Sequence, residues 1–244
     1  MTKLSARDFL TPLAIMIAGA AISGSIVWTS QHTPAPIISV AAAAPEPAAQ
    51  PAPQSAPVVD VADIKTEGEP FIGDANATAT IAYWFDYQCP YCRQQEEVVL
   101  PQAIDDYVKA GKLKIVFKDF PFLGSDSETA ALIARAVWEA NPEKFGEWHK
   151  AMFDHQDGEN AGWGSKGDIL AMTKTIPGLD EAKVEWLLAG HAAAYQNAIE
   201  ASMAEGSSIG VNGTPAFVIG KRFIAGAVPY RQFKAAIEMA LSSK

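Results

Sequence analysis

The only two cysteines of the chain, Cys89 and Cys92, stand two residues apart in the segment Cys89-Pro90-Tyr91-Cys92. This segment follows an apolar run at residues 81–85 and opens a stretch with the pattern of a helix. Two thiols on the first turn of a helix can close into a disulfide without moving the backbone. The unpaired N–H groups and the positive dipole end of that helix favour a thiolate at Cys89. The pair therefore predicts a redox-active disulfide that exchanges with thiols of other proteins.

The two cysteines are expected to have different tasks. The leading cysteine of a Cys-x-x-Cys segment at a helix start can have a pKa of about 3.5–7, against about 8.5 for a free thiol. Pro90 and Tyr91 tune that value. Because Tyr91 offers only a neutral O–H or a ring edge, we expect a lowered but not extreme pKa for Cys89. Cys92 lies one turn further on, where it should be buried and should resolve the mixed disulfide.

Two other uses of the cysteines fit the sequence less well. A structural disulfide across so short a loop would restrict the unfolded chain little and stabilise the fold little. A four-ligand zinc site needs a second Cys or His pair, and the four histidines contain none at ligand spacing. The position between a predicted strand and a predicted helix favours redox chemistry. We expect no metal ion and no nucleotide or organic cofactor.

The beginning of the chain has the pattern of an export signal. Lys3 and Arg7 precede an apolar stretch at residues 9–28, about the length that crosses a bilayer, and no further lysine or arginine comes before Lys65. Residues 1–30 are therefore predicted to be a signal anchor or signal peptide, with the N-terminus in the cytoplasm. The alanines at residues 41–44 lie farther from the apolar stretch than a usual cleavage site, which favours an uncleaved anchor.

A linker and one folded domain are predicted to follow. Residues 31–60 are rich in proline and alanine, which favours extended polyproline II. The formal net charge of −9 argues against nucleic acid as a partner. Residues 61–244 form the predicted domain, with core strands at residues 78–85 and 112–120 joined by a helix at 90–110 that Pro101 should kink. A crossover helix between two strands predicts a parallel pair.

A helical block is predicted between the second and third core strands, at about residues 125–208. Ser125 and Glu128 have the spacing of a capping box at its start. Asp180 should cap a short helix that ends at Gly190, with another helix at residues 192–205. Short strands at residues 215–219 and 222–225 and a final helix from Pro229 complete the expected elements. The fold class is therefore α/β, with a helical insertion in a small domain.

Three stretches resemble the DsbA-like thiol–disulfide oxidoreductases of the thioredoxin superfamily: residues 81–92 with the lead-in 69–73, residues 118–124, and residues 210–220. The likeness spans about residues 66–243. It implies a thioredoxin fold in which Cys89 is the nucleophile, Cys92 the resolving thiol and Pro215 a cis-proline packed against the pair. Thr214 would then offer its backbone N–H and C=O to an extended partner strand.

One position departs from the family pattern. Many relatives carry a glutamate six residues before the first cysteine, where it handles protons for the buried thiol, and this chain has Tyr83 there. Tyrosine titrates near 10 and cannot replace that acid at neutral pH. Asp86, Glu96 and Lys118 are candidates to substitute, although the sequence favours reading them as surface charges.

Aromatic residues near the cysteines divide into two expected groups. Trp84 and Phe85 are expected in the core, whereas Tyr87, Tyr91 and Phe122 are candidates for a shallow groove that binds unfolded clients. The tryptophans of the helical block are expected in the core: Trp138, Trp148, Trp163 and Trp186.

The function expected from these features is that of a periplasmic disulfide donor anchored to the bacterial inner membrane. Its substrates would be unfolded or newly exported proteins with free thiols, and a membrane redox partner would reoxidise it. An isomerase or reductase is the first alternative, although residues 61–75 are too short for a full dimerisation domain. A metal-binding chaperone, for instance for copper(I), is the second, and two sulfurs without a nearby methionine argue against it. The sequence leaves the clients and the oligomeric state undefined.

Overall fold

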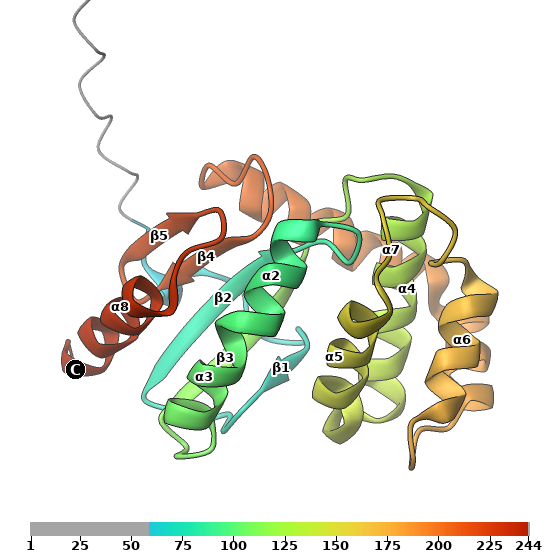
Figure 1. Cartoon of the computed structure of the whole chain (residues 1–244), viewed down its shortest axis with the longest axis horizontal. Coiled ribbons are helices and arrows are strands. Elements are labelled where there is room, and N and C mark those ends of the chain that lie inside the picture. Colours follow the sequence, from blue (N-terminus) through green and yellow to red (C-terminus); the bar gives the residue numbers. More distant parts are fainter. Residues whose placement is uncertain (1–58, 244) are drawn as a thin grey trace, which may run out of the picture. The chain divides into compact units, whose positions relative to one another are not determined.

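A five-stranded mixed β-sheet lies at the centre of the computed structural model, which describes residues 59–243 (Figure 1). The strand order is β1-β3-β2-β4-β5. The parallel pair is β2 and β3, as expected, and the other neighbouring strands are antiparallel. The strands are β1 (Phe71–Ile72), β2 (Ala79–Phe85), β3 (Leu113–Asp119), β4 (Ala216–Ile219) and β5 (Arg222–Ala225).

Helices lie on both sides of this sheet. Figure 1 shows α2, α3 and α8 in front of it and α7 behind it, with α4, α5 and α6 beside the sheet. The helical segments are η1 (Val61–Asp63), α2 (Pro90–Val98), α3 (Leu100–Ala103), the π-helical turn η2 (Ile104–Val108), α4 (Ser125–Ala140), η3 (Pro142–Lys144), α5 (Phe145–His155), α6 (Lys166–Thr175), α7 (Glu181–Ser208) and α8 (Tyr230–Ser242). A thioredoxin-like α/β arrangement with helices between β3 and β4 is therefore present.

The predicted kink near Pro101 is also present. Helix α2 ends at Val98 and α3 begins at Leu100, with Pro101 in the first turn of α3. Proline lacks the N–H that would continue the α2 ladder, so the helix has to restart there. The short strand β1 was missed, because two residues carry no alternating pattern.

Two predictions about helix ends are wrong. Ser125 does not cap α4: the N-cap is Gly124, at φ +102°, and no side chain caps that helix. The reciprocal capping box lies instead at α6, between Ser165 and Asp168. Asp180 caps its helix as expected, yet α7 continues unbroken through Gly190 to Ser208. A glycine inside a helix costs only about 1 kcal/mol, which packing of α7 against α4 offsets.

The two faces of β2 are buried in different clusters. Tyr83 and Phe85 face the main core, which also holds both cysteines. Trp84 faces a second cluster on the other side of the sheet, together with Ile64 and Phe120. The main-chain N–H of Val61 donates to the Gly220 carbonyl at 2.7 Å, so the chain enters the fold on that second face. Burial of Trp84 and Phe85 was expected and is confirmed.

The four tryptophans of the helical block differ in burial. Trp148 is fully buried, and Trp138 and Trp163 are partly buried against the main core. Trp186 is 69% exposed, so its assignment to the core is wrong.

The predicted signal anchor at residues 1–30 lies outside the described residues, as does the predicted linker apart from residues 59 and 60. Within residues 59–243, none of the helices combines the length and the apolar character needed to cross a membrane.

Helix α7 makes a close contact with Trp84. The indole Nε1 of Trp84 donates to the Ser202 carbonyl at 3.1 Å. Gly206 lies one turn further along, where an added Cβ would approach Nε1 to 2.7 Å. The fully buried indole has no room to retreat, so this position of α7 requires glycine.

We expect Gly206→Ala to lower the free energy of unfolding by about 1–2 kcal/mol, since overpacking a dense core costs about 1–3 kcal/mol. Gly190→Ala is the matched control on the same helix, because nothing lies within 4 Å of its added Cβ. That control should raise the free energy of unfolding by about 0.5–1 kcal/mol through helix propensity. Urea denaturation measures both changes. Equal stabilities of the two variants would contradict the close contact.

Candidate active site

Cys89 is the N-cap residue of α2, and Pro90 occupies its first turn, as the sequence predicts. The turn that leads from β2 into α2 is held by Asp86. Its Oδ1 accepts from the Gln88 N–H at 2.8 Å, and its Oδ2 accepts from Phe122 N–H at 2.9 Å. The Cys89 N–H donates to the Asp86 carbonyl at 3.1 Å. These bonds fix the start of α2 relative to the loop after β3.

Both cysteines are free thiols in this structure, and both are buried. The Cys89 side chain is 4% exposed and that of Cys92 is 0% exposed. The Cys89 thiol donates to the Thr214 carbonyl oxygen, with 3.3 Å between sulfur and oxygen. The Thr214–Pro215 peptide bond is cis, in agreement with the resemblance. The structure thus brings Cys89, Cys92 and Thr214 together, although their catalytic use stays a prediction.

The environment separates the two thiols by their pKa. The Cys92 thiol, as a hydrogen-bond donor, is the main cause that lowers the pKa of Cys89 to about 6; burial opposes it, and Thr214 and the N–H groups of Cys92 and Tyr91 assist. Burial, followed by the proximity of Cys89, raises the pKa of Cys92 well above its usual value. At neutral pH the site therefore holds a thiolate at Cys89 and a thiol at Cys92, as the sequence predicts.

The residues between the cysteines contribute through the backbone. The Tyr91 side chain is 63% exposed, and it is the N–H of this residue that lowers the pKa of Cys89. The hydroxyl of Thr214 is buried and has no hydrogen-bond partner, which leaves it free to donate to a thiolate. The tuning effect predicted for Pro90 and the Tyr91 ring stays a prediction.

Tyr83 is fully buried beside Cys92, at the position where relatives have an acid. Its ring stacks on Phe217 with 4.6 Å between centroids. Burial raises the pKa of Tyr83 well above its usual value, and the nearby Cys92 and Glu96 raise it further. The contact with the thiol falls short of hydrogen-bond geometry, so the Tyr83 hydroxyl has no partner. Tyr83 is therefore a neutral phenol with an unused donor.

The prediction that Asp86, Glu96 and Lys118 are surface charges is wrong. Asp86 and Lys118 are each 1% exposed, and the Glu96 side chain is 10% exposed. Lys118 Nζ pairs with Glu69 at 2.8 Å and with Glu205 at 2.9 Å. Sequence reasoning could not find these pairs, because the partners come from separate elements.

Helix α5 and the residue that caps its C-terminus supply two contacts that the sequence does not single out. Gln156 Nε2 donates to the Tyr87 carbonyl at 2.6 Å and to the Cys89 carbonyl at 3.2 Å. His149 Nδ1 lies 2.8 Å from the Tyr87 hydroxyl, and its Nε2 lies 2.9 Å from Glu96 Oε1. Tyr87 is only 3% exposed, so its assignment to a client groove is wrong. No periodicity or spacing in the sequence pairs α5 with the cysteines.

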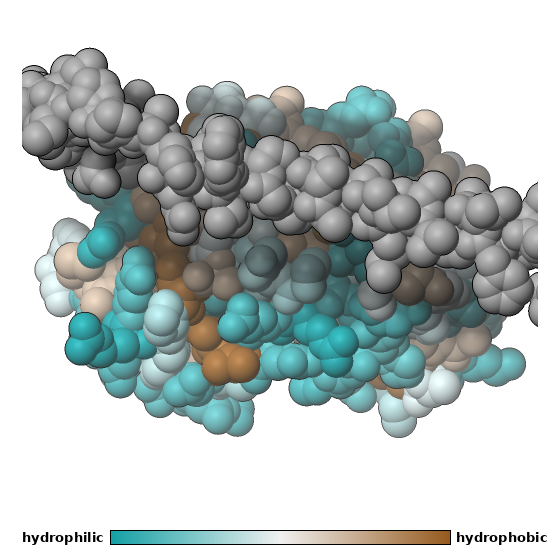
Figure 2. All heavy atoms as spheres, turned by 45° about the horizontal axis from the view of Figure 1, so that its top comes forward, coloured by the Kyte–Doolittle hydropathy of each residue, from teal (hydrophilic) through white to brown (hydrophobic). Residues whose placement is uncertain are grey.

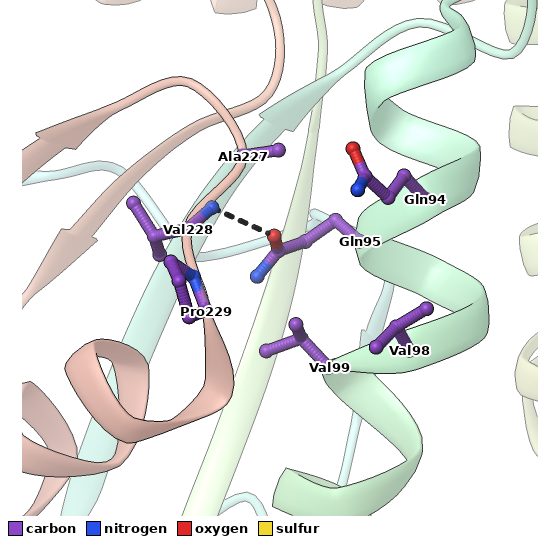
Figure 3. Close-up of a pocket in the computed structure, with 7 residues that line it drawn as sticks. All are labelled: Gln94, Gln95, Val98, Val99, Ala227, Val228 and Pro229. Carbon is purple, nitrogen blue, oxygen red and sulfur yellow. Dashed lines mark hydrogen bonds between the residues drawn. The ribbon is translucent and has the colours of Figure 1, made fainter.

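A groove lies next to α2, between this helix and the loop that leads into α8 (Figure 3). Its volume is about 380 Å³, and its walls are mostly apolar: Gln94, Gln95, Val98, Val99, Ala227, Val228 and Pro229. The Val228 N–H donates to Gln95 Oε1 at 3.1 Å, whereas the buried Gln95 Nε2 has no partner. The groove therefore combines an apolar wall with one unused donor.

Exposed apolar residues are few near the cysteines. Val98 is 56% exposed, and Tyr91 and Phe122 are 63% and 47% exposed. Figure 2 shows a narrow hydrophobic strip within a largely hydrophilic face.

Among residues 59–243, no group of three or more His, Cys, Asp or Glu side chains is arranged to hold a metal ion.

Comparisons with known proteins agree with this fold. A family model described as Thioredoxin matches residues 65–239. The chain is 25% identical over 178 residues to disulfide bond formation protein D of Bacillus subtilis, covering 73% of this chain and 79% of that protein. The structure of oxidised BdbD from Bacillus subtilis is similar, with TM-score 0.67, 23% identity, and 73% and 96% coverage of the two chains. The thiol–disulfide exchange protein α-DsbA2 of Wolbachia pipientis has TM-score 0.61, 27% identity, and 70% and 86% coverage.

Alkylation of the reduced chain by iodoacetamide should rise with pH around a midpoint near 6, the pKa of Cys89. The pKa of Cys89 is lower in the folded chain than in the unfolded chain. The thiolate therefore stabilises the folded reduced chain fully at pH values above the pKa of the unfolded cysteine. That stabilisation is lost as the pH falls through about 6.

Thr214→Val removes the hydroxyl donor and should raise the alkylation midpoint by about one pH unit, since a hydrogen bond to a charged group contributes about 1.5–3 kcal/mol. The control is Thr175→Val on α6, which contributes no residue to the site and should leave the midpoint unchanged. A wild-type midpoint near 8.5, the value of a free cysteine, would contradict the assignment of Cys89 as the nucleophile.

Proposed function

The chain belongs to the thioredoxin family and is a thiol–disulfide oxidoreductase, and from this premise we propose that it donates the Cys89–Cys92 disulfide to exported proteins. The observation that carries the proposal is the contrast between the two sulfurs. The pKa of Cys89 is lowered to about 6, whereas that of Cys92 is raised by burial. A stabilised thiolate in the reduced form makes the disulfide a stronger oxidant.

The reaction passes through a mixed disulfide. A client thiolate attacks Cys89 Sγ, the Cys89–Cys92 bond breaks, and Cys92 leaves with the electron pair. A second client thiolate then attacks the client sulfur of the mixed disulfide, and Cys89 leaves as a thiolate. The client loses two electrons and the enzyme gains them. A low pKa makes Cys89 a good leaving group in this second step.

Two surfaces support binding of extended clients. Thr214 offers backbone hydrogen-bonding groups beside the cysteines, in the manner of an added β-strand. The groove along α2 accepts apolar side chains against Val98 and Val99, and Gln95 Nε2 can donate to a client carbonyl. Unfolded proteins present both features, whereas folded proteins hide them.

We propose that the domain at residues 61–244 acts in the periplasm, held to the inner membrane by a signal anchor at residues 1–30 and the linker at 31–60. The basic residues before the apolar stretch and their absence from the linker support this orientation. A membrane partner that accepts electrons from the reduced pair would then regenerate the disulfide.

An anchored chain should stay with the membrane fraction after washing with alkaline carbonate, because only detergent releases a bilayer-spanning helix. Full-length chain in envelope preparations is the material to assay, with an antibody against the folded domain. Recovery of the chain in the wash would contradict the anchor and leave the redox chemistry untouched.

A reductase or isomerase is the second candidate, and one observation favours it. The pKa of about 6 for Cys89 lies nearer the roughly 7 of thioredoxin than the roughly 3.5 of the strongest oxidant of the family. The reduction potential separates the two: a value near about −120 mV fits a disulfide donor, and one near about −270 mV fits a reductant.

Cys92→Ala should accumulate mixed disulfides through Cys89 when incubated with envelope extracts, because the resolving thiol is gone. Cys89→Ala should trap nothing. Non-reducing electrophoresis with mass spectrometry identifies the captured proteins. Adding Val98→Asp to the trap should reduce the captured protein but leave reaction with a small disulfide unchanged, whereas Trp186→Asp, on a helix outside the groove, should change neither.

No captured species in this trap, together with normal oxidation of reduced clients by the double cysteine variant, would remove the proposed function.

A further inference from the structure

We propose that Gln156, at the end of α5, is a positioning residue for Cys89: its side-chain amide holds the main chain around the nucleophile and favours a thiolate there. This role rests on the thiol–disulfide exchange proposed for Cys89 and Cys92. It gives the helical block between β3 and β4 a share in setting how strongly the pair oxidises its clients.

The amide of Gln156 binds two carbonyl oxygens of the turn between β2 and α2. Its Nε2 donates to the Tyr87 carbonyl at 2.6 Å and to the Cys89 carbonyl at 3.2 Å. Carbonyl oxygens only accept hydrogen bonds, so the NH₂ end of the amide, with its positive partial charge, has to face the turn. Gln156 is 5% exposed, so little water competes for these bonds.

The main chain of Gln156 is itself held by both helices. Its N–H donates to the Phe153 carbonyl of α5 at 3.3 Å. Its carbonyl accepts from Arg93 Nη1 of α2 at 2.7 Å, and the Nε of the same guanidinium pairs with Glu97 at 2.6 Å. The Arg93 N–H donates to the Cys89 carbonyl at 3.1 Å. Gln156 therefore binds the first turn of α2 both at its beginning and at its end.

The segment after Gln156 makes a further contact with the same turn. The Asn160 N–H donates to Gln88 Oε1 at 3.0 Å. Gln88 lies between Tyr87 and Cys89, so three successive residues of the turn bind the segment that follows α5. Figure 1 shows the end of α5 and the start of α2 at the same end of the molecule. The start of α2 is thus fixed to the helical block as well as to the strand that precedes it.

Two effects of this contact favour a thiolate at Cys89. The first is electrostatic: the carbonyl oxygen and the sulfur belong to one residue, and a donor at that oxygen offsets negative charge close to the sulfur. The second is geometric, because the N–H groups of Tyr91 and Cys92 stabilise the thiolate only while the first turn keeps its position. Gln156 therefore acts on the sulfur through the backbone of Cys89.

A change at Gln156 should reach the redox equilibrium. In the reduced chain the Cys89 sulfur is charged at neutral pH, whereas in the disulfide it is not, so a group that favours the thiolate favours the reduced form. The disulfide then oxidises clients more strongly. Weakening the contact should make the pair a weaker oxidant without altering which sulfur reacts.

Opposite charges placed at Gln156 separate this role from a packing role, with alkylation of the reduced full-length protein as the first readout. Gln156→Glu puts an anion at the two carbonyls and should raise the midpoint by about one to two pH units, as expected for a unit charge about 6 Å away at an effective dielectric constant of about 20. Gln156→Lys keeps a donor and adds a positive charge, so it should lower the midpoint. Gln156→Met only removes the donor and should raise the midpoint by about half a unit to one unit.

The equilibrium with glutathione at pH 7 is the second readout. A rise in the pKa of Cys89 from about 6 should weaken Gln156→Glu as an oxidant by roughly 5- to 10-fold, which corresponds to about 20–30 mV in reduction potential. Gln156→Lys should instead be a stronger oxidant than the wild type. A packing defect would move both variants in the same direction.

Gln102 supplies the matched controls, because its Nε2 also donates to a main-chain carbonyl, that of Val98, at 2.6 Å. It lies on α3, about three helical turns beyond Cys92. Changing Gln102 to Glu, Lys or Met should leave both readouts at their wild-type values. Near-UV circular dichroism checks that each variant is folded, and the opposite signs expected for Gln156→Met and Gln156→Lys still decide the matter without the Glu variant.

Shifts of the same sign in Gln156→Glu and Gln156→Lys, or no shift in either, overturn the role of Gln156. A wild-type protein in which the alkylation midpoint of Cys89 is not lowered would instead overturn the proposed function.

Discussion

The hydrogen bond that the Cys92 thiol donates to the Cys89 sulfur is the interaction on which the chemistry of this site depends. The thiol of Cys92 is the largest cause of the lowered pKa of Cys89, ahead of any backbone donor. This contact exists only because α2 begins at Pro90 and keeps the two sulfurs one turn apart. Asp86 and Gln156 fix that turn from both sides, through bonds to Gln88 and to the Cys89 carbonyl.

Much of the architecture is predictable because local patterns and burial agree. Strands β2 and β3 form where the sequence is rich in apolar residues. Pro101 interrupts its helix because proline has no N–H to donate. The redox pair is readable from its position between a strand and a helix. The unbroken course of α7 through Gly190 is not, because contact with α4 outweighs a local preference of about 1 kcal/mol.

The buried charges were the least predictable part. Lys118 is 1% exposed, and its partners Glu69 and Glu205 stand before β1 and near the end of α7. The residues near Lys118 in the sequence do not indicate these two partners, so the sequence predicts a lysine on the surface. Glu96 is different, because its spacing of four from Cys92 on one helix was visible in the sequence. Its contact with His149 could not be predicted, because His149 lies on a helix more than fifty residues further along the chain.

The place where the chain enters the fold has a mechanical consequence. Ile64 is buried with Trp84 and Phe120, the Val61 N–H donates to Gly220, and Lys65 N–H donates to Glu205 at 2.8 Å. These attachments all lie on the side of the sheet away from α2. A force transmitted along the preceding residues is therefore borne by the Trp84 face and by α7. The contacts that such a force meets first are therefore not those that hold the helix with the sulfurs.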